Sequence, residues 1–438
     1  MTSSILSAPL AAQAHALSKK GDWNGAAEKL KTLISELTES DVIQLSINRD
    51  QYSLNSLNGF VSLSNGREYF FKYHHEEGEE HSIEEYYRAE LLKEHGFPVD
   101  VPVFACKEPG RQILLYNKRN DSRLADVCRE IESGHNPDLL FSVVDAQIEF
   151  DKLTLSKTLQ SYKTATAEQV GAEAIHQLFY RRLTDGKNPD GFGGRVNTFY
   201  VNKRFQLGNV ILDWETFSHA KWQINGDLFP LSIHELFTLS AKKLQPEHLA
   251  RHGVVTAHGD AHNANVWYED GEKAILSLFD PAFAGEYIPA LLAEIKATFH
   301  NIYAHPYWLY EPSLAEQQYE VTAQYDPESN RIIVTHNWQL SRLRGLFLES
   351  KVTHYWKPLI TFLQRKNVLP SDWKEIIRMG LFCCPTLVMD LRANGLSSHT
   401  THSSPLGFAI AVSLANSSES SLSNWLDKIS ISQDEKNE

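Results

Sequence analysis

Polar side chains gather between apolar runs in one short stretch, residues 254–286, which reads VVTAHGDAHNANVWYEDGEKAILSLFDPAFAGE. Asp260 and Asn265 lie in the loop after the first apolar run, and Asp280 follows the second. Carboxylate and amide oxygens are hard ligands that suit magnesium, whose other ligands are usually water and phosphate oxygens. The spacing therefore predicts that Asn265 and Asp280 hold Mg²⁺, which leaves Asp260 to orient and deprotonate a hydroxyl.

A purely structural role is the competing interpretation for each of these residues. Asp260 and Asn265 would then cap a loop, and Asp280 would be the turn residue before Pro281. Their joint spacing favours chemistry, because kinases share the interval Asp-x-x-x-x-Asn followed by a metal-binding Asp after a strand.

The motif HGDAHNAN, from His258 to Asn265, resembles the HGDxHxxN catalytic loop of the aminoglycoside phosphotransferase and choline kinase family. The segment LFDPAFAGE is similar to the one that supplies the second metal-binding aspartate in that family. The resemblance implies a protein-kinase-like, two-lobed α+β fold, with a small antiparallel sheet and one helix in the N-lobe and a mainly helical C-lobe. It implies ATP and Mg²⁺ as cofactors and Asp260 as the catalytic base. We group His258 and His262 with this catalytic loop; His258 is expected to brace it, whereas the role of His262 stays open.

The resemblance also implies a nucleotide site upstream. Lys72, in the strand-like run YFFKYH, corresponds to the lysine that contacts the α- and β-phosphates, although an edge lysine that merely reaches solvent is the alternative. Glu85 in the next predicted helix is the expected partner of Lys72, with Glu84 and Glu90 as competing candidates. Backbone groups around Tyr116 are expected to meet the adenine.

Three features depart from the family pattern. The nucleotide-covering turn at 48–59, NRDQYSLNSLNG, lacks a GxGxxG motif, so its phosphate contacts stay unassigned. The helix after the metal aspartate usually opens with an Asp that braces the catalytic loop; here Leu292 is near that position and Glu294 is a candidate substitute. A long stretch separates the expected hinge from His258, which indicates an insertion.

The elements that must position these residues follow from hydrophobic periodicity. In the first half, two helices are predicted at 8–38 and three strands, with a turn at Ser64–Gly66, at 42–73. A helix at 82–95, ended by Gly96, and two more strands at 101–117 follow. Further on, we expect a helix at 171–186, strands at 194–214, and mainly helices from 330 to 395. The glycine cluster GKNPDGFGG at 186–194 does not open a helix after a strand, so we interpret it as a turn, and no GxxxxGK[ST] motif occurs.

These elements suggest three parts of the chain. Residues 1–40 are a helical extension, 41–117 a nucleotide-binding N-lobe, and 118–430 a C-lobe with the catalytic loop, the acceptor site and an insertion around 135–250.

Composition limits the partners. The chain has 438 residues, 42% hydrophobic and 22% charged, which is typical of a folded protein with two or three lobes. The formal net charge of −13 argues against nucleic acid or an anionic membrane as a main partner. The four cysteines lack zinc-site spacing, no basic signal-peptide start is present, and no apolar run reaches the roughly 20 residues that span a bilayer. We therefore expect a cytoplasmic protein. The composition does not determine its oligomeric state.

The expected substrate is a small molecule with a hydroxyl acceptor: a sugar, amino sugar, amino alcohol or aminoglycoside-like compound. Three segments are candidates for the acceptor wall: the insertion, residues 298–312 and residues 397–405. The second contains Glu311, and the third contains His399 and His402. A nucleotide-binding regulatory module with little catalysis is the alternative. Protein kinase activity is a weaker third, because Gly259 replaces the HRD arginine and no APE-like segment follows Asp280.

Overall fold

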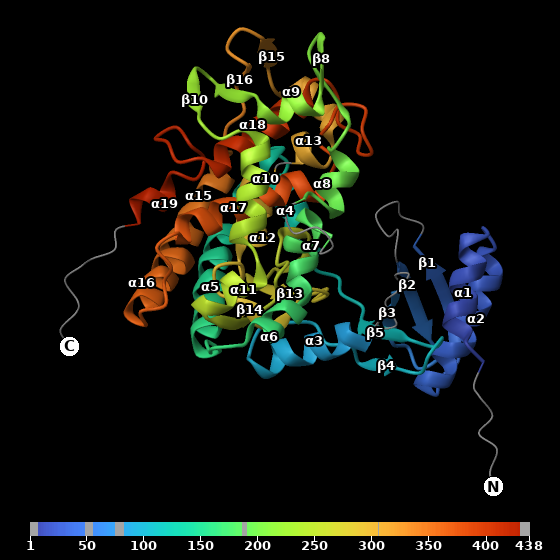
Figure 1. Cartoon of the computed structure of the whole chain (residues 1–438). Helices are drawn as coiled ribbons and strands as arrows, with labels where there is room; N and C mark the ends of the chain where they lie inside the picture. The colour runs from blue at the N-terminus through green and yellow to red at the C-terminus, as the bar shows by residue number, and fades with distance from the viewer. Residues whose placement is uncertain (1–7, 49–55, 75–82, 186–190, 305, 430–438) are drawn as a thin grey trace. The chain divides into compact units, whose positions relative to one another are not determined.

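The chain forms two compact units in the computed structural model, which describes residues 8–48, 56–74, 83–185, 191–304 and 306–429. For residues 56, 74, 83–85, 306 and 307 the structure describes the backbone but not the side chains. The first unit comprises residues 1–122 and 277–282, and the second comprises 123–276 and 283–438. Each unit can be followed separately in Figure 1.

The first unit is built on a five-stranded sheet in the order β1–β2–β3–β5–β4, in which every neighbouring pair is antiparallel. Its elements are α1 (Leu10–Lys19), α2 (Trp23–Thr38), β1 (Val42–Ile47), β2 (Ser56–Leu63), β3 (Glu68–His74), α3 (Ile83–Glu94), β4 (Phe104–Cys106) and β5 (Ile113–Asn117). The predicted elements of residues 8–117 are thus confirmed, as is the glycine stop of α3, because Gly96 has a left-handed φ of 79°.

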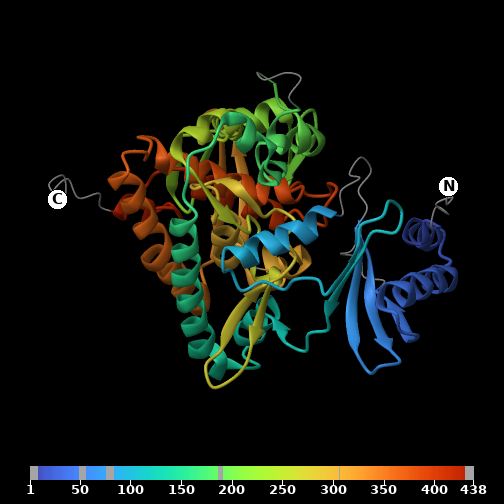
Figure 2. The ribbon, with the colours of Figure 1, turned by 90° about the horizontal axis from the view of Figure 1, so that it is seen from below.

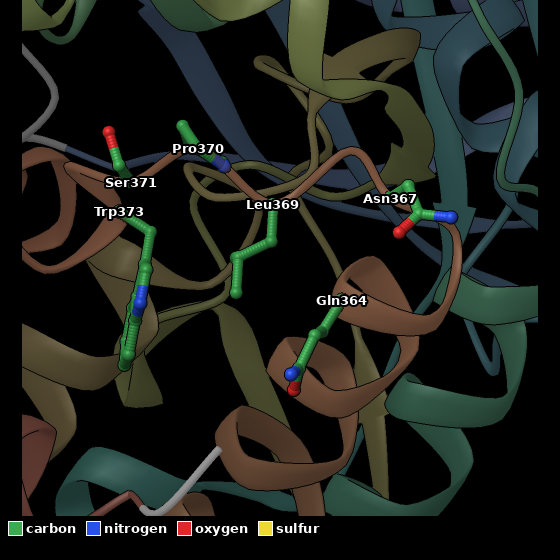
Figure 3. Close-up of a pocket in the computed structure, with 6 residues that line it drawn as sticks. All are labelled: Gln364, Asn367, Leu369, Pro370, Ser371 and Trp373. Carbon is green, nitrogen blue, oxygen red and sulfur yellow. The ribbon is translucent and has the colours of Figure 1, made fainter. Parts of the chain in front are cut away.

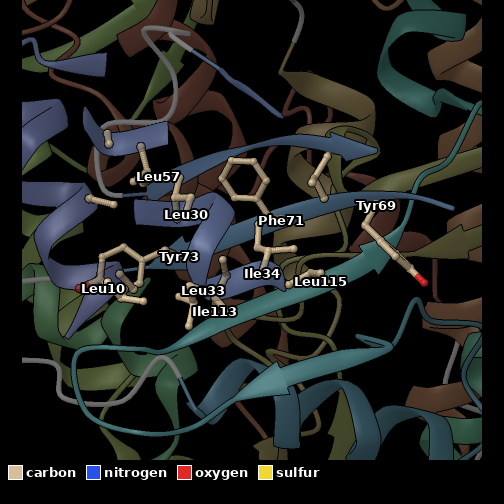
Figure 4. Close-up of a cluster of buried hydrophobic side chains, with 14 of the residues drawn as sticks. Leu10, Leu30, Leu33, Ile34, Leu57, Tyr69, Phe71, Tyr73, Ile113 and Leu115 are labelled. Atoms are coloured by element: carbon tan, nitrogen blue, oxygen red, sulfur yellow. The ribbon is translucent and has the colours of Figure 1, made fainter. Parts of the chain in front are cut away.

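Helices α1 and α2 share one core with the sheet (Figure 4). Along β3 the side chains alternate, as a strand requires. Tyr69, Phe71 and Tyr73 are buried in the core that includes α1 and α2, whereas Phe70 and Lys72 belong to the opposite set and are only partly buried. The alternation therefore places Lys72 on the face of the sheet turned away from α1 and α2.

The second unit is mainly helical. Its first half contains α4 (Leu124–Glu132), η1 (Pro137–Leu139), α5 (Leu140–Gln160), α6 (Ala167–Ala172), η2 (Ala174–Gln177), α7 (Tyr180–Leu183), α8 (Gly194–Phe199), β7 (Arg204–Leu207), β8 (Val210–Asp213), α9 (Trp214–His219), β9 (Lys221–Ile224), β10 (Asp227–Phe229), α10 (Ile233–Lys243), α11 (Pro246–Leu249) and η3 (Ala250–His252). The two-residue strand β6 (Ser122–Arg123) crosses the division of the chain between the two units, as does β13 (Ile275–Leu278).

Its second half begins with the segment that carries the predicted catalytic loop. The elements are β11 (Val254–Ala257), η4 (Asn263–Asn265), β12 (Val266–Glu269), β13 (Ile275–Leu278), β14 (Gly285–Pro289), α12 (Ile295–Thr298), η5 (Phe299–Tyr303), α13 (Pro306–Leu309), η6 (Pro312–Leu314), α14 (Ala315–Gln318), β15 (Val321–Asp326), β16 (Arg331–His336), α15 (Arg342–Lys351), η7 (Val352–Trp356), α16 (Lys357–Arg365), α17 (Trp373–Val388), α18 (Ser403–Ala415) and α19 (Trp425–Lys428). Both η5 and η7 are π-helical turns.

Helices cover most of the core of this unit. α17 packs on α10 and α18, while α15 and α16 lie alongside α5, as Figures 1 and 2 show from two directions. A four-stranded sheet, in the order β10–β9–β16–β15, packs on α18. An α+β chain with a small antiparallel sheet in one unit and a mainly helical second unit confirms the fold class predicted from the sequence.

Four local predictions need correction. Residues 194–199 form helix α8 rather than a strand, and the predicted helix at 171–186 is broken into α6, η2 and α7. The glycine cluster does open a helix at Gly194, although that helix follows α7 and not a strand. Residues 331–336 form strand β16, which pairs with β9 in parallel and with β15 in an antiparallel hairpin. The parallel pairing with β9 joins distant segments, and local periodicity does not report such pairing.

No helix in the described part of the chain is both long and apolar enough to cross a bilayer. All four cysteines are unpaired thiols, three of them buried.

Candidate active site

The predicted catalytic loop leaves β11, a strand in which every residue is buried and which pairs antiparallel with β14. Gly259 has a left-handed φ of 77°, and a Cβ atom there would lie 2.6 Å from the backbone oxygen of Phe283. Both facts exclude other residues, since an L side chain would be strained and would clash. The glycine of the HGD motif is thus required by the turn that presents Asp260.

His258 is almost fully buried, and its Nδ1 accepts a hydrogen bond from the backbone N–H of Asp260 at 3.3 Å. A ring that accepts from the next turn of the loop fixes the backbone at the catalytic position. The contact agrees with the bracing role expected for His258.

Asn265 ties the other end of the loop to Asp260. Its Nδ2 donates to the backbone oxygen of Asp260 at 3.1 Å, and its own N–H donates to the backbone oxygen of His262 at 2.7 Å. The side-chain nitrogen is therefore used inside the loop, and the side-chain carbonyl oxygen is the group that suits a hard cation such as Mg²⁺. His262 accepts from the N–H of Ala264 through Nδ1 at 3.3 Å, so it caps η4.

The Asp260 carboxylate is mostly buried and poorly hydrogen-bonded. Its Oδ1 is buried and has no hydrogen-bond partner among the described residues. Two cationic or ionisable groups approach it without reaching hydrogen-bond distance: Lys296 Nζ is 3.7 Å from Oδ1, and His262 Nε2 is 3.8 Å from Oδ2. Buried carboxylate oxygens normally have donors, so an unsatisfied one at this position is suited to accept a proton or a hydrogen bond from a bound molecule.

The loop has a second brace that the sequence analysis did not identify. Asn301, on the π-helical turn η5, accepts from the N–H of Asn263 at 2.7 Å and donates to the backbone oxygen of Ala261 at 3.4 Å. Glu294, the candidate for this task, is instead buried against Lys351 with 3.0 Å between Oε2 and Nζ, and the alternative position, Leu292, is fully buried. The signal for Asn301 was present in the run FHNIY, but only the fold brings that run to the loop.

Asp280 lies in the first unit, where its Oδ1 is 2.8 Å from Nζ of Lys72. The segment before it is anchored by two backbone hydrogen bonds of Leu278, from its N–H to Pro98 and from the N–H of Asp100 to its oxygen, at 2.6 and 2.8 Å. Asp280 has a φ of 54°, in the left-handed region, directly before Pro281. Few non-glycine residues adopt this conformation, and such strained positions cluster at functional sites.

The other two predicted nucleotide-binding residues also belong to the first unit. Tyr116, on β5, is paired with Phe70 of β3, and two pairs further along the same ladder Lys72 is paired with Leu114. Tyr116 and Lys72 are thus held on neighbouring strands. Glu85 is in α3, but its side chain, and that of Glu84, lie outside the described residues, as do residues 49–55 of the predicted nucleotide-covering turn.

Most candidate acceptor-wall residues have structural partners. In segment 298–312 the aromatic side chains Phe299, Tyr303 and Trp308 are fully buried, whereas Tyr310 is 41% exposed. The carboxylate of Glu311 pairs with Arg129. In segment 397–405 the buried His399 ring bonds to the Ser403 hydroxyl, and His402 Nε2 bonds to the backbone oxygen of Tyr319 at 2.7 Å.

A surface pocket of about 380 Å³ lies elsewhere in the second unit, between the end of α16 and the start of α17 (Figure 3). Its lining residues are Gln364, Asn367, Leu369, Pro370, Ser371 and Trp373. None of them has an ionisable side chain, and none was predicted as a site residue. We give this pocket no catalytic role.

No family model matches the chain, and no curated protein matches it. Among solved structures it is similar to the amicoumacin kinase hAmiN in complex with AMP-PNP, Ca²⁺ and Ami, at 13% identity and a TM-score of 0.44, over 85% of this chain and 88% of that one. It is also similar to a spectinomycin phosphotransferase in complex with ADP and spectinomycin, at 13% identity and a TM-score of 0.38, over 89% of this chain and 97% of that one. A third, a type I macrolide 2′-phosphotransferase, has 12% identity and a TM-score of 0.35, over 80% and 94%. We assign neither a family nor a substrate to this chain from these matches.

Proposed function

We propose that this protein is an ATP-dependent phosphotransferase that moves the γ-phosphate to a hydroxyl of a small metabolite, such as a sugar, amino sugar, amino alcohol or aminoglycoside-like compound. The observation that carries the proposal is the state of Asp260. Its backbone is held by His258 and Asn265, whereas Oδ1 of its carboxylate is buried without a hydrogen-bond partner among the described residues. A fixed and unsatisfied carboxylate in an Asp-x-x-x-x-Asn loop has the properties of a kinase base.

In this reaction, Asp260 accepts the proton of the acceptor hydroxyl as its oxygen bonds to the γ-phosphorus. The bond from the γ-phosphorus to the β,γ-bridging oxygen breaks, and the nucleoside diphosphate leaves with the electron pair. Phosphoryl transfer depends mainly on positioning and charge stabilisation. The braces from His258, Asn265 and Asn301 therefore serve the reaction by fixing the direction of the base.

The nucleotide-binding roles extend the proposal. Lys72 contacts the α- and β-phosphates, Glu85 pairs with Lys72, and backbone groups near Tyr116 receive the adenine. Asn265 and Asp280 are the magnesium ligands, and their donor set, one amide oxygen and one carboxylate, suits that ion. When bound, Mg²⁺ supplies charge neutralisation on the phosphate oxygens.

A nucleotide-binding module with little catalysis remains the alternative function. One reason for that alternative was the missing aspartate that braces the catalytic loop in the family. Asn301 makes bonds to both sides of His262 in the loop, so the brace is present with a different residue. This observation favours the enzyme.

The test is nucleotide consumption over a panel of sugars, amino sugars, amino alcohols and aminoglycosides, for the wild type and for Asp260→Asn. We expect Asp260→Asn to lower kcat at least about 100-fold, since general-base catalysis typically contributes about 10² to 10⁴. Asp270→Asn, an exposed aspartate in the turn after β12, is the matched control and should keep the wild-type rate. A wild type that binds nucleotide but turns over with no acceptor would support the module instead.

A further inference from the structure

A buried polar chain leads from the helix after β14 to the predicted base. Lys296 on α12 and His300 on η5 are four residues apart, and Lys296 Nζ is 2.8 Å from His300 Nε2. The other ring nitrogen of His300, Nδ1, is hydrogen-bonded to the hydroxyl of Tyr310. Lys296 is only 4% exposed and His300 only 7%, so both polar groups are withdrawn from solvent.

The direction of the hydrogen bonds in this chain follows from protonation. Burial, reinforced by the positive charge of Lys296, holds the pKa of His300 well below its usual value, so the ring is neutral. A lysine ammonium can only donate, and therefore Nε2 of His300 is the acceptor. Nδ1 then carries the proton and donates to the oxygen of Tyr310. The histidine is thus fixed in one tautomer, and it directs the ammonium of Lys296.

The carboxylate that faces this ammonium is Asp260. Among the described residues, Asp260 provides the one carboxylate within ion-pair distance of Lys296, with 3.7 Å between Nζ and Oδ1. Taking an ammonium out of water is unfavourable unless an opposite charge and hydrogen bonds compensate for the lost solvation. His300 supplies the hydrogen bond and Asp260 supplies the charge. The same separation leaves Oδ1 without a direct donor, so the carboxylate keeps its capacity to accept a proton.

The segment that carries Lys296 and His300 is held firmly. Nη1 of Arg344 donates to the backbone oxygens of His300, Asn301 and Ala304, at 3.5, 3.4 and 3.2 Å. These carbonyl groups lie in and just after the π-helical turn η5. Arg344 itself is paired with Glu132 of α4 at 2.7 Å. Because Asn301 on the same turn braces the catalytic loop, one π-helical turn positions both the loop and the histidine that holds Lys296.

We propose that Lys296 is a positioning residue for Asp260: its ammonium, directed by His300 and Tyr310, holds the carboxylate in place and offsets its negative charge near the transferred phosphoryl group. The proposal rests on the proposed function, because it assigns Lys296 a task in that reaction. Without the ammonium, two negative groups, the base and the γ-phosphate, would have to approach each other in a site largely withdrawn from water. Like charges at such short range repel strongly at low effective dielectric.

The experiment compares Lys296→Met, Lys296→Arg and Tyr310→Phe with the wild type. The assay is steady-state hydrolysis of ATP with Mg²⁺ and no added acceptor. Water then accepts the phosphoryl group, so the natural acceptor does not have to be known. We expect Lys296→Met to lower kcat about 100-fold with little change in KM for ATP, as for a misplaced catalytic group. Lys296→Arg should recover part of kcat, because it restores the charge. Tyr310→Phe should lower kcat about tenfold, a typical effect of losing a group that orients a functional residue.

Lys243→Met is the matched control, since Lys243 is also partly buried and ion-paired, with Asp372 and Glu375, away from the catalytic loop. It should keep the wild-type kcat. A wild-type kcat in Lys296→Met, or a raised KM with unchanged kcat, would overturn the positioning role while leaving the kinase intact. If Lys296→Met does not fold, the exposed Tyr310→Phe decides, and a wild-type kcat there counts against the proposal. A wild type that neither hydrolyses nor binds ATP would refute the proposed function itself.

Discussion

Lys72 and Asp280 form an ion pair with 2.8 Å between Nζ and Oδ1, although 208 residues separate them in the chain. Strand alternation turns Lys72 away from the core that includes α1 and α2, and the bonds of Leu278 fix the segment that delivers Asp280. The Lys72 side chain is 13% exposed and that of Asp280 is 39% exposed. An ion pair that is partly open to solvent contributes little to stability. We therefore interpret the pair as part of the nucleotide site rather than as a structural contact.

Substitutions of Asn265 should separate its two tasks. Asn265→Asp keeps an oxygen ligand but loses the Nδ2 donor to the backbone oxygen of Asp260, whereas Asn265→Ala loses both. We expect Mg²⁺-dependent stabilisation by ATP to persist in Asn265→Asp and to disappear in Asn265→Ala. Turnover should fall in both, by about 10- to 100-fold in Asn265→Asp, as when a group that orients a ligand is lost. Full turnover in Asn265→Asp would show that the bond to Asp260 is dispensable.

A buried charge network in the second unit makes Lys351 important for stability. Its Nζ contacts Asp151 and is 3.0 Å from Oε2 of Glu294, and all three side chains are almost fully buried. Removing the cation leaves two carboxylates buried together, so Lys351→Met should lower the free energy of unfolding by about 3–5 kcal/mol. Denaturant unfolding measures this cost.

Glu294→Gln is the matched variant for the same network. Burial raises the pKa of Glu294, so its charge is already disfavoured, and the neutral substitution should cost less than Lys351→Met. Equal costs for the two variants would contradict this account of the network.

Much of the fold could be predicted from local patterns, whereas the candidate site was proposed from a motif. The alternation in β3 and the turn at Ser64–Gly66 predicted the sheet, and the motif led to the expectation that His258 braces the loop. Lys296 was missed, because a lysine in AEIKATFHN is typical of a helix surface until the fold buries it beside Asp260. Asn301 was missed for a related reason: its partner Asn263 lies 38 residues away in the sequence, and no periodicity reports such a contact. The parallel pairing of β16 with β9 also joins distant segments.

Acid should destabilise the second unit through buried histidines. Burial lowers the pKa of His176 and that of His399 from 6.5 to about 4. Because the folded-state pKa lies below the unfolded one, their contribution is complete above pH 6.5 and is lost as the pH falls toward 4. Each can lower the free energy of unfolding by up to about 1.4 kcal/mol per pH unit in this window. His176→Gln and His399→Gln should flatten the pH dependence of denaturant unfolding between pH 6.5 and 5, and an unchanged slope in both would contradict the assignment.

The most direct measurement of the central claim is thermal stability with ATP or GTP, with and without Mg²⁺, for the wild type and for Asp280→Ala. Each protein is compared with its own nucleotide-free state, because alanine at the left-handed φ of 54° lowers stability by itself. We predict that nucleotide at a hundred times its dissociation constant adds about 2.7 kcal/mol to the wild type in the presence of Mg²⁺. The Mg²⁺-dependent part should vanish in Asp280→Ala and persist in the control Asp270→Ala. No stabilisation of the wild type by either nucleotide would contradict the account.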